Sequence, residues 1–223
     1  MLAEIPNADK ADMLISHLSN SNTFGTEHPF PTLSADSEHF SENGEGYRGS
    51  VFPIMNFMVI KGLEKYQHFE LARECSIRHL YFILEGLIPH DQKQKGDLFE
   101  AYCPCKEGKA SYSENPDWPR SHFLISAGLS TIALMIENVI GLSISLPRKT
   151  VDWIIPNLEI MGIENLSLKR NLITILSNKS SRGWEIQMES EKLYYFTINI
   201  LNQQKKKTLP IPSGKCSMLI DKL

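Results

Sequence analysis

The sequence predicts a mainly α-helical chain that ends in a small antiparallel β domain. Two observations carry this prediction: apolar residues recur at helical spacing before Gly141, and apolar and polar residues alternate after it. With 223 residues, 42% of them hydrophobic, the chain is long enough to bury one large core or two small ones. Helices and strands that are segregated along a chain form separate layers or subdomains. We therefore expect a helical part at 1–141 and a β domain at 142–223.

Four segments of the first part have the apolar periodicity of helices. Asn7 is suited to cap the first of them, and Pro53 fits the first turn of the second. The last is apolar nearly all round, which predicts burial on most of its sides. The expected helices are 8–18, 52–66, 69–87 and 121–140. The segment 19–49 between the first two is a long loop, and a loop of that length in a compact domain is usually either functional or wrongly assigned as a loop.

The part that follows Gly141 contains three segments with the pattern of strands. In the second, Trp184, Ile186 and Met188 alternate with polar residues. The expected strands are 171–176, 184–188 and 194–201. The turns between them are polar and short, which predicts a meander in one small antiparallel sheet.

Composition excludes several classes of partner. The 23 Lys and Arg residues are outnumbered by 26 Asp and Glu residues, and the net charge of −3 implies no basic face for nucleic acid. The longest apolar stretch, 123–136, is too short to cross a bilayer. No signal peptide is visible at the N-terminus, and the run Lys205–Lys207 is typical of a solvated patch. We expect neither a nucleic acid nor a membrane as a partner, and the sequence assigns no compartment.

The four cysteines predict neither a disulfide scaffold nor a metal site. Cys103 and Cys105 are only one residue apart, whereas a zinc half-site needs a wider spacing and a second ligand pair. We expect small buried or half-exposed thiols, and no cofactor.

The loops contain short motifs in a recognisable order. One is Gly46-Tyr47-Arg48-Gly49-Ser50, directly before an expected helix, and another is Glu100-Ala101-Tyr102-Cys103-Pro104. Together with 24–36 and 123–141, they resemble the C-terminal half of the (α/α)6-toroid glycoside hydrolases, the clan of trehalases, processing α-glucosidase I and mannosylglycerate hydrolases. The resemblance implies a partial (α/α)6 toroid followed by a small β-sandwich.

The same resemblance implies that Glu100 is the general base of an inverting glycoside hydrolase acting on α-linked oligosaccharides. Inverting hydrolysis needs an acid and a base on opposite sides of the sugar, roughly 6.5–9.5 Å apart so that a water fits between them. The competing interpretation of Glu100 is an ordinary surface carboxylate, because glutamates are rarely buried.

Sugar contacts are implied for several other positions. The Arg48 guanidinium can bind sugar hydroxyls or hold a carboxylate, and a structural ion pair at a helix start is the alternative. Tyr47 and Phe52 can stack on a pyranose face or belong to the core. Asp36 resembles a residue that lines the site, although an Asx-turn explains it equally well.

Two further aromatic residues belong to this predicted site. Trp118 is expected to line the same cleft, and a packing anchor in a proline-rich loop is the alternative. Tyr102, beside Glu100, offers a second aromatic surface for a sugar.

The sequence also departs from the family pattern. No tryptophan precedes Arg48, Ser50 stands in place of a usual proline, Phe52 replaces a usual tryptophan, and Ile125 stands where an aromatic residue is frequent. These changes remove stacking or turn-fixing chemistry, so they affect affinity for sugar more than the fold.

The general acid of the clan is an aspartate in the first half of the toroid, upstream of the position of Met1. Asp97 is too close to Glu100 to act from the opposite side, and the family pattern gives Asp36 no proton-donor role. A base without an acid loses most of general acid–base catalysis. We therefore expect no turnover by this chain alone. Either the chain is a fragment of a longer glycosidase, with its catalytic partner upstream, or it is one half of a split enzyme, with an N-terminal half-toroid in trans as a partner. The alternatives are a non-catalytic carbohydrate-binding remnant and a helical interaction module that self-associates.

Overall fold

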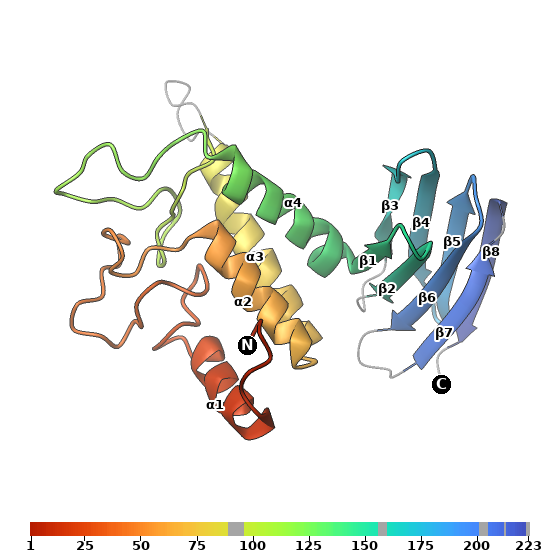
Figure 1. Cartoon of the computed structure of the whole chain (residues 1–223), viewed down its shortest axis with the longest axis horizontal. Coiled ribbons are helices and arrows are strands. Elements are labelled where there is room, and N and C mark those ends of the chain that lie inside the picture. Colours follow the sequence, from red (N-terminus) through yellow and green to blue (C-terminus); the bar gives the residue numbers. More distant parts are fainter. Residues whose placement is uncertain (89–95, 156–159, 201–204, 212, 222–223) are drawn as a thin grey trace. The chain divides into compact units, whose positions relative to one another are not determined.

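A computed structural model describes residues 1–88, 96–155, 160–200, 205–211 and 213–221. Contacts within the chain divide it into two compact units, Met1–Val139 and Ile140–Leu223. We call them the helical unit and the β unit and describe each by itself (Figure 1). The domain limits 1–141 and 142–223 stay a prediction, because compactness does not show that either part folds alone.

The helices of the first unit lie close to where the sequence predicts them. They are α1 (Ala8–Ser19), α2 (Pro53–Lys65) and α3 (Phe69–Leu87), and a last helix in three contiguous parts, η1 (Leu124–Gly128), α4 (Leu129–Leu134) and η2 (Met135–Ile140). The Asn7 Oδ1 accepts a hydrogen bond from the Lys10 amide at 3.1 Å, which caps α1. Pro53 is the first residue of α2, where its missing amide hydrogen has no cost.

The last helix differs from the expectation in two ways. Its two ends, η1 and η2, are π-helical. In addition, the Thr131 hydroxyl donates a hydrogen bond of 2.5 Å to the backbone carbonyl of Ala127, four residues earlier. The predicted burial on most sides is wrong. Ile125 is 82% exposed and Leu129 is 64% exposed, because one narrow stripe that includes Ala127 and Leu134 is turned inward.

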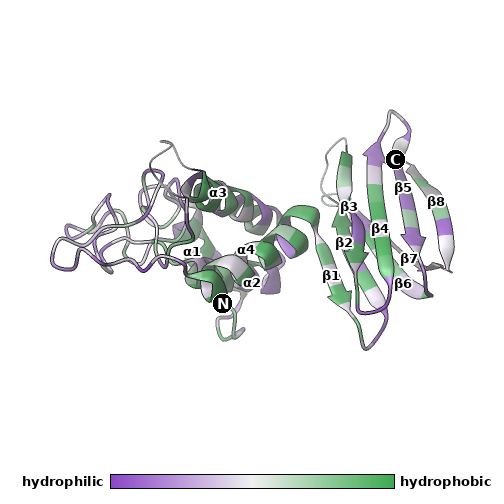
Figure 2. Cartoon of the chain, turned by 90° about the horizontal axis from the view of Figure 1, so that it is seen from above, coloured by the Kyte–Doolittle hydropathy of each residue, from purple (hydrophilic) through white to green (hydrophobic). Residues whose placement is uncertain are grey.

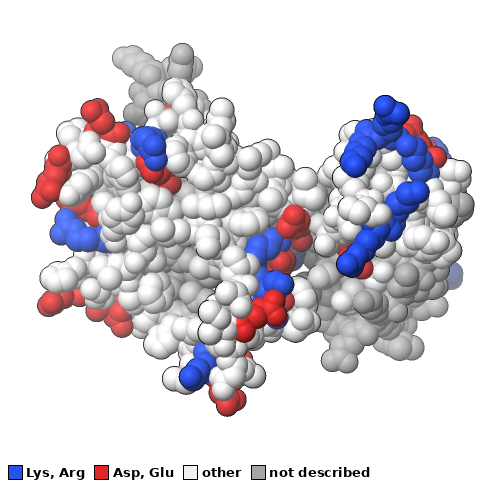
Figure 3. Space-filling view, in the orientation of Figure 1, with Lys and Arg blue, Asp and Glu red and all other residues white. Residues whose placement is uncertain are grey.

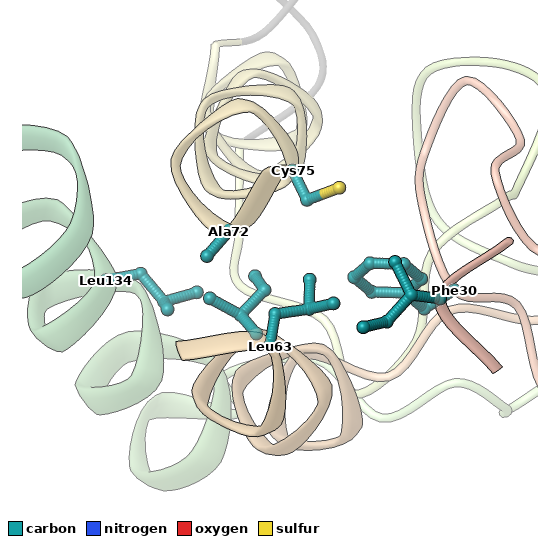
Figure 4. Packing of buried hydrophobic residues seen from close by; sticks show 7 residues of the cluster. Phe30, Leu63, Ala72, Cys75 and Leu134 are labelled. Carbon is teal, nitrogen blue, oxygen red and sulfur yellow. The ribbon is translucent and has the colours of Figure 1, made fainter. Parts of the chain in front are cut away.

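The main core of the helical unit lies where these helices meet. Figure 4 shows Leu63 of α2, Ala72 and Cys75 of α3, and Leu134 of α4 converging, with Phe30 of the long loop beside them. Each of these side chains is at most 5% exposed. A loop residue therefore completes the core, so the long segment between α1 and α2 is packed against the helices.

The described part of the β unit forms two four-stranded sheets. Their orders are β1-β2-β6-β7 and β3-β4-β5-β8. The strands are β1 (Leu142–Ser145), β2 (Thr150–Ile155), β3 (Ile160–Ser167), β4 (Leu172–Lys179), β5 (Gly183–Ser190), β6 (Tyr194–Ile200), β7 (Lys205–Ile211) and β8 (Gly214–Asp221). Hydrophobic and hydrophilic segments alternate along the strands (Figure 2), as the sequence predicts for β5, in which Trp184, Ile186 and Met188 are buried. The C-terminal β part is thus confirmed.

The single meander expected from the sequence is wrong. β4 and β5 pair as an antiparallel hairpin, but β6 leaves their sheet and pairs in parallel with β2. Alternation specifies which face of a strand is buried and carries no information on which strand is its neighbour.

Helix and strand occupy comparable shares of the chain, so "mainly α" overstates the helical part. The described helices do not by themselves close a ring, and the (α/α)6 toroid stays a prediction. No described helix is long and apolar enough to cross a membrane.

Candidate functional site

A pocket of about 720 Å³ lies among the loops of the helical unit. Small-molecule sites usually have volumes of about 300–1,000 Å³. Its walls come from the segment before α2 and from the segment between α3 and η1. The lining residues are Glu45, Gly46, Tyr47, Arg48, Glu100, Tyr112, Asn115, Asp117, Trp118 and Arg120.

Backbone hydrogen bonds join the two segments behind the pocket. Val51 and Tyr102 exchange two amide-to-carbonyl bonds of 2.9 Å, and the Ala110 amide donates to the Ala101 carbonyl at 3.1 Å. Phe52, Ala101 and Ala110 form a small buried cluster against which Trp118 packs. The backbone next to Glu100 is therefore held on both sides by paired chain.

Glu100 is bound by one arginine through both carboxylate oxygens. Arg120 Nε donates to Oε2 at 2.8 Å and Arg120 Nη2 donates to Oε1 at 2.6 Å. The Glu100 amide also donates to the Arg120 carbonyl at 2.9 Å, and the guanidinium lies 4.7 Å from the centre of the Phe123 ring. The hydrogen bond from Arg120 lowers the pKa of Glu100 against the opposing effect of burial. Glu100 is thus ionised at neutral pH, as a general base must be.

A second carboxylate of the pocket, that of Glu45, is also paired with an arginine. Glu45 forms an ion pair with Arg48, three residues along the chain, and accepts a hydrogen bond from the Ser113 hydroxyl. The Ser113 hydrogen bond, followed by the charge of Arg48, lowers the pKa of Glu45. A general acid needs a raised pKa, and the shifts of both Glu45 and Glu100 run in the opposite direction.

An aromatic group forms another part of the pocket. Tyr47 is 72% exposed and stacks on Phe52, with ring centroids 5.4 Å apart and planes 18° apart. Trp118 lies 6.3 Å from Phe52 and 6.3 Å from Tyr112, the latter edge to face. Exposed aromatic faces of this kind are what a sugar ring stacks on.

The structure brings four of the predicted site residues together and separates the other three from the pocket wall. Glu100, Arg48, Tyr47 and Trp118 all line the pocket. Phe52 is buried behind Tyr47, and Tyr102 is fully buried, with its hydroxyl accepting from the Phe99 amide at 3.0 Å. Burial raises the Tyr102 pKa to about 12. Asp36 is not a lining residue, and its carboxylate accepts from the Ser34 hydroxyl at 2.6 Å. The functional roles of all seven stay predictions.

Sequence reasoning missed the partners of the two carboxylates. Glu45 precedes Arg48 by three residues, and that spacing was a usable signal for an ion pair. Arg120 lies twenty residues from Glu100, and only the fold shows that they meet. The aromatic Tyr112 and the polar Asn115 and Asp117 of the pocket were also overlooked.

A buried histidine pair supports the pocket from behind. His28 Nε2 lies 2.7 Å from His79 Nδ1, and His28 Nδ1 lies 3.2 Å from the Cys103 carbonyl. Since a carbonyl only accepts, His28 Nδ1 carries the hydrogen, His28 Nε2 accepts, and His79 Nδ1 donates. His28 also contacts Tyr102 edge to face at 5.8 Å. The pair thus links the long loop, α3 and the segment that follows Glu100.

Both histidines are neutral at physiological pH. Burial, followed by the neighbouring His79, lowers the pKa of His28 well below its usual value, and burial lowers that of His79 to about 3. His79 Nε2 has no hydrogen-bond partner among the described residues.

The cysteines are free thiols. Cys75 and Cys103 are buried, and Cys105 and Cys216 are half-buried, as expected. Among the described residues, no three His, Cys, Asp or Glu side chains are grouped so that they could hold a metal ion.

Comparison with known families agrees with this architecture. The family model of the mannosylglycerate hydrolase MGH1-like glycoside hydrolase domain matches residues 1–119, more than half of the chain. The chain belongs to this glycoside hydrolase family. The model of the trehalase C-terminal domain matches residues 141–223, which makes the whole chain related to the trehalase and mannosylglycerate hydrolase-like glycoside hydrolases.

A relative from Borreliella burgdorferi, described as an uncharacterized protein, is 58% identical over 224 residues. The match takes in 100% of this chain and 47% of that relative, so the chain spans about half the length of the curated relative it matches.

Proposed function

We propose that the helical unit binds an α-linked oligosaccharide in this pocket and supplies Glu100 as the general base of an inverting glycoside hydrolase. The observation that carries the proposal is an ionised carboxylate, Glu100, in the wall of a pocket that also exposes the face of Tyr47. Ionised carboxylates activate water, and exposed aromatic faces bind sugar rings. Membership of a glycoside hydrolase family supports the same assignment.

The other lining residues suit the recognition of hydroxyl groups. Arg48 and Arg120 each retain N–H groups beyond those that bind carboxylates, and Asn115 adds an amide. We propose Tyr47 and Trp118 as the stacking surfaces, with Phe52 as the support beneath Tyr47. Tyr102 acts from the interior, because its hydroxyl accepts a hydrogen bond from the amide of Phe99, the residue before Glu100.

We propose that the general acid comes from outside this pocket, because the resemblance to the family assigns that role to no residue of this chain. Glu45 and Glu100 both have lowered pKa values, and Asp97 is held by His122, whose Nδ1 lies 2.9 Å from a carboxylate oxygen. We propose that a second polypeptide segment, an N-terminal half-toroid in trans, provides the acid. The greater length of the relative leaves room for such a segment.

The first test is binding. Calorimetric titration of the full chain with a panel of α-linked oligosaccharides is expected to give heat with at least one sugar, and Tyr47→Ala is expected to weaken that binding about tenfold. Tyr81→Ala, which removes an exposed tyrosine of α3 that does not line the pocket, is the matched control. An absence of heat with every sugar contradicts the proposal.

The second test is hydrolysis. The chain mixed with a candidate N-terminal half is expected to hydrolyse an α-linked oligosaccharide, and Glu100→Gln is expected to abolish the activity while binding persists. Equal rates for the wild-type and Glu100→Gln mixtures would show that Glu100 is not the base.

A second candidate function, carbohydrate binding without hydrolysis, is favoured by the contact with Arg120. Both oxygens of Glu100 accept hydrogen bonds from one guanidinium, which weakens the carboxylate as a base. This candidate predicts sugar binding by the chain and no hydrolysis in any mixture with an N-terminal half.

A third candidate, a helical interaction module, is favoured by exposed apolar side chains on the helices. Such patches mark interfaces in soluble proteins. They include Ile54, Met55, Met58, Ile77, Tyr81, Leu84, Leu124, Ile125, Leu129 and Ile132. Light scattering over a wide concentration range tests self-association, and a monomer throughout excludes it.

A further inference from the structure

Three turns of the β unit lie together at one end of the sandwich. β2 and β6 are parallel, and Thr150 at the start of β2 lies opposite Tyr195 at the start of β6. The β1–β2 turn and the β5–β6 turn, which lead into these two strands, are therefore neighbours. Ile173 at the start of β4 is opposite Ser190 at the end of β5, which places the β3–β4 turn at this end too. We call residues 146–149, 168–171 and 191–193 the turn end.

Hydrogen bonds join each of these turns to the end of a neighbouring strand. The Tyr195 amide donates to the Lys149 carbonyl at 2.9 Å. Asn171 Nδ2 donates to the Ser190 hydroxyl oxygen at 3.1 Å, and the Leu172 amide donates to Glu191 Oε2 at 3.2 Å. The turn end is therefore a single connected surface, with each turn fixed to the neighbouring strand or turn.

The turn end is strongly basic. Its three segments contain five cations and one carboxylate, Glu191. All five cations are exposed, and within the described residues none forms an ion pair. They are Arg148, Lys149, Lys169, Arg170 and Lys192. Figure 3 shows Lys and Arg side chains gathered in a curved band over the β unit.

Large apolar side chains lie beside these cations. Leu172 is 44% exposed, Leu193 is 46% exposed and Tyr195 is 46% exposed. A soluble polyanion such as a nucleic acid satisfies the cations but does not bury the leucines, since it offers stacking and phosphate contacts. An anionic bilayer surface satisfies both, because its head groups attract Lys and Arg while leucine and tyrosine enter the interface below them.

We propose that the turn end of the β unit is a docking surface for anionic phospholipid membranes. The cations contact the head groups, and Leu193 and Leu172 enter the region beneath them. This binding is peripheral, so it is consistent with the finding that no described helix could span a membrane. It replaces, for this end of the β unit, the expectation from composition that the chain has no membrane partner.

The test is co-sedimentation of the full chain with vesicles. Vesicles of phosphatidylcholine mixed with phosphatidylglycerol are expected to bind the chain, and vesicles of phosphatidylcholine alone are not. Raising the NaCl concentration is expected to weaken the binding, because salt screens exposed charges. Equal binding to both vesicles, or to neither, overturns the proposal.

Variants distinguish vesicle binding through the turn end from a general effect of the charge of the chain. The double variant Arg148→Glu/Arg170→Glu is expected to reduce vesicle partitioning on the order of 100-fold. Leu193→Ser is expected to reduce it about tenfold without changing the charge. The matched control is Lys179→Glu/Arg182→Glu, which reverses two cations near the β4–β5 turn at the opposite end, and it is expected to bind like the wild type.

Two outcomes with these variants overturn the proposal. One is a control variant that loses as much binding as the turn-end variant. The other is a single-stranded oligonucleotide that binds the chain and displaces it from vesicles, with Leu193→Ser having no effect on either. Circular dichroism of each variant checks that the fold is retained.

Discussion

The two units of this protein differ in the large side chains that they bury. The helical unit has polar groups in its interior, among them His28, His79 and Asn56, and these hold long loops against the helices. The large side chains in the interior of the β unit, such as Trp153 and Phe196, are aromatic or aliphatic. A repeated pattern of apolar residues specifies the buried faces of the strands, whereas the loops that form the pocket depend on individual polar contacts. The two units should therefore respond differently to substitution and to pH.

Removing one large side chain should separate the units most clearly. Phe196→Ala leaves a cavity in the sandwich and is expected to destabilise the β unit by about 3–5 kcal/mol, with little effect on the helical unit. Leu63→Ala is the matched variant in the helical core, with an expected loss of about 2–5 kcal/mol there. Urea unfolding in a Trp118→Phe background, followed by the fluorescence of Trp153 and Trp184 and by helical circular dichroism, measures the two units. Equal shifts of both signals with either variant contradict the comparison.

Acid should destabilise the helical unit selectively. The folded pKa values of His28 and His79 lie below the unfolded value of 6.5, so the unfolded chain binds more protons and stability falls as the pH drops below 6.5. Each imidazole contributes a slope of about 1.4 kcal/mol per pH unit down to its folded pKa, which is about 3 for His79. Urea midpoints between pH 7.5 and 5.5 measure the slope.

Two substitutions test the origin of that slope. His79→Gln is expected to reduce the pH dependence of the helical unit by about half. His39→Gln removes an exposed histidine and serves as the control. A slope that survives His79→Gln unchanged would assign the acid sensitivity to other groups.

The backbone next to Arg48 should be less tolerant than a comparable turn elsewhere. Gly49 has a φ of +113°, and an added Cβ would lie 2.8 Å from the Phe40 ring and 2.9 Å from the Ser41 carbonyl oxygen. Gly49→Ala is expected to cost about 2–3 kcal/mol and to weaken sugar binding. Gly108, with a φ of +103° and nothing within 4 Å of an added Cβ, is the control that measures backbone strain alone, about 1 kcal/mol. Equal losses for both variants would show that crowding at Gly49 is unimportant.

The smallest expected effect on stability is that of Arg120→Gln. Arg120 is an exposed partner, so its loss is expected to cost less than about 1 kcal/mol. The pKa of Glu100 should nevertheless rise, because Arg120 is the main cause of its lowering. Carboxyl carbon chemical shifts followed by NMR titration measure that pKa. Lys65→Gln, which breaks the exposed ion pair with Glu4, is the control and should leave Glu100 unchanged.

The sequence predicts the helices well because each carries its own local signals. Asn7 and Pro53 mark the starts of α1 and α2, and the apolar spacing of α3 is continuous. The strands were predicted less completely. β3 contains a bulge between Ile163 and Leu166 that interrupts its alternation, and β7 begins with the run Lys205–Lys207, which resembles a loop. The sheet to which β6 belongs depends on pairing with β2, more than forty residues earlier, and no local pattern encodes that pairing.

The candidate site likewise has features that local motifs predict and others that depend on the fold. The motifs around Tyr47 and Glu100 predict two walls of one pocket, since both resemble segments of one family. The ion pair of Glu100 with Arg120 arises from a loop path that the sequence does not specify. Tyr102 shows the limit of motif reasoning, because an aromatic residue beside the proposed base is buried as support instead of facing the pocket.

The order of the strands has a consequence for biosynthesis. The final two strands, β7 and β8, cover β6 in one sheet and β5 in the other. The sheet that contains β7 cannot complete its hydrogen bonds until residues up to 211 have left the ribosome, and the sheet that contains β8 not until residues up to 221 have done so. Every residue of the helical unit emerges earlier. A ribosome that stalls or terminates before Lys205 would release a chain in which β6 and β5 are open edges, and open edges recruit other strands. Chains that end before β7 are therefore expected to associate through these edges more readily than chains that include β7 and β8.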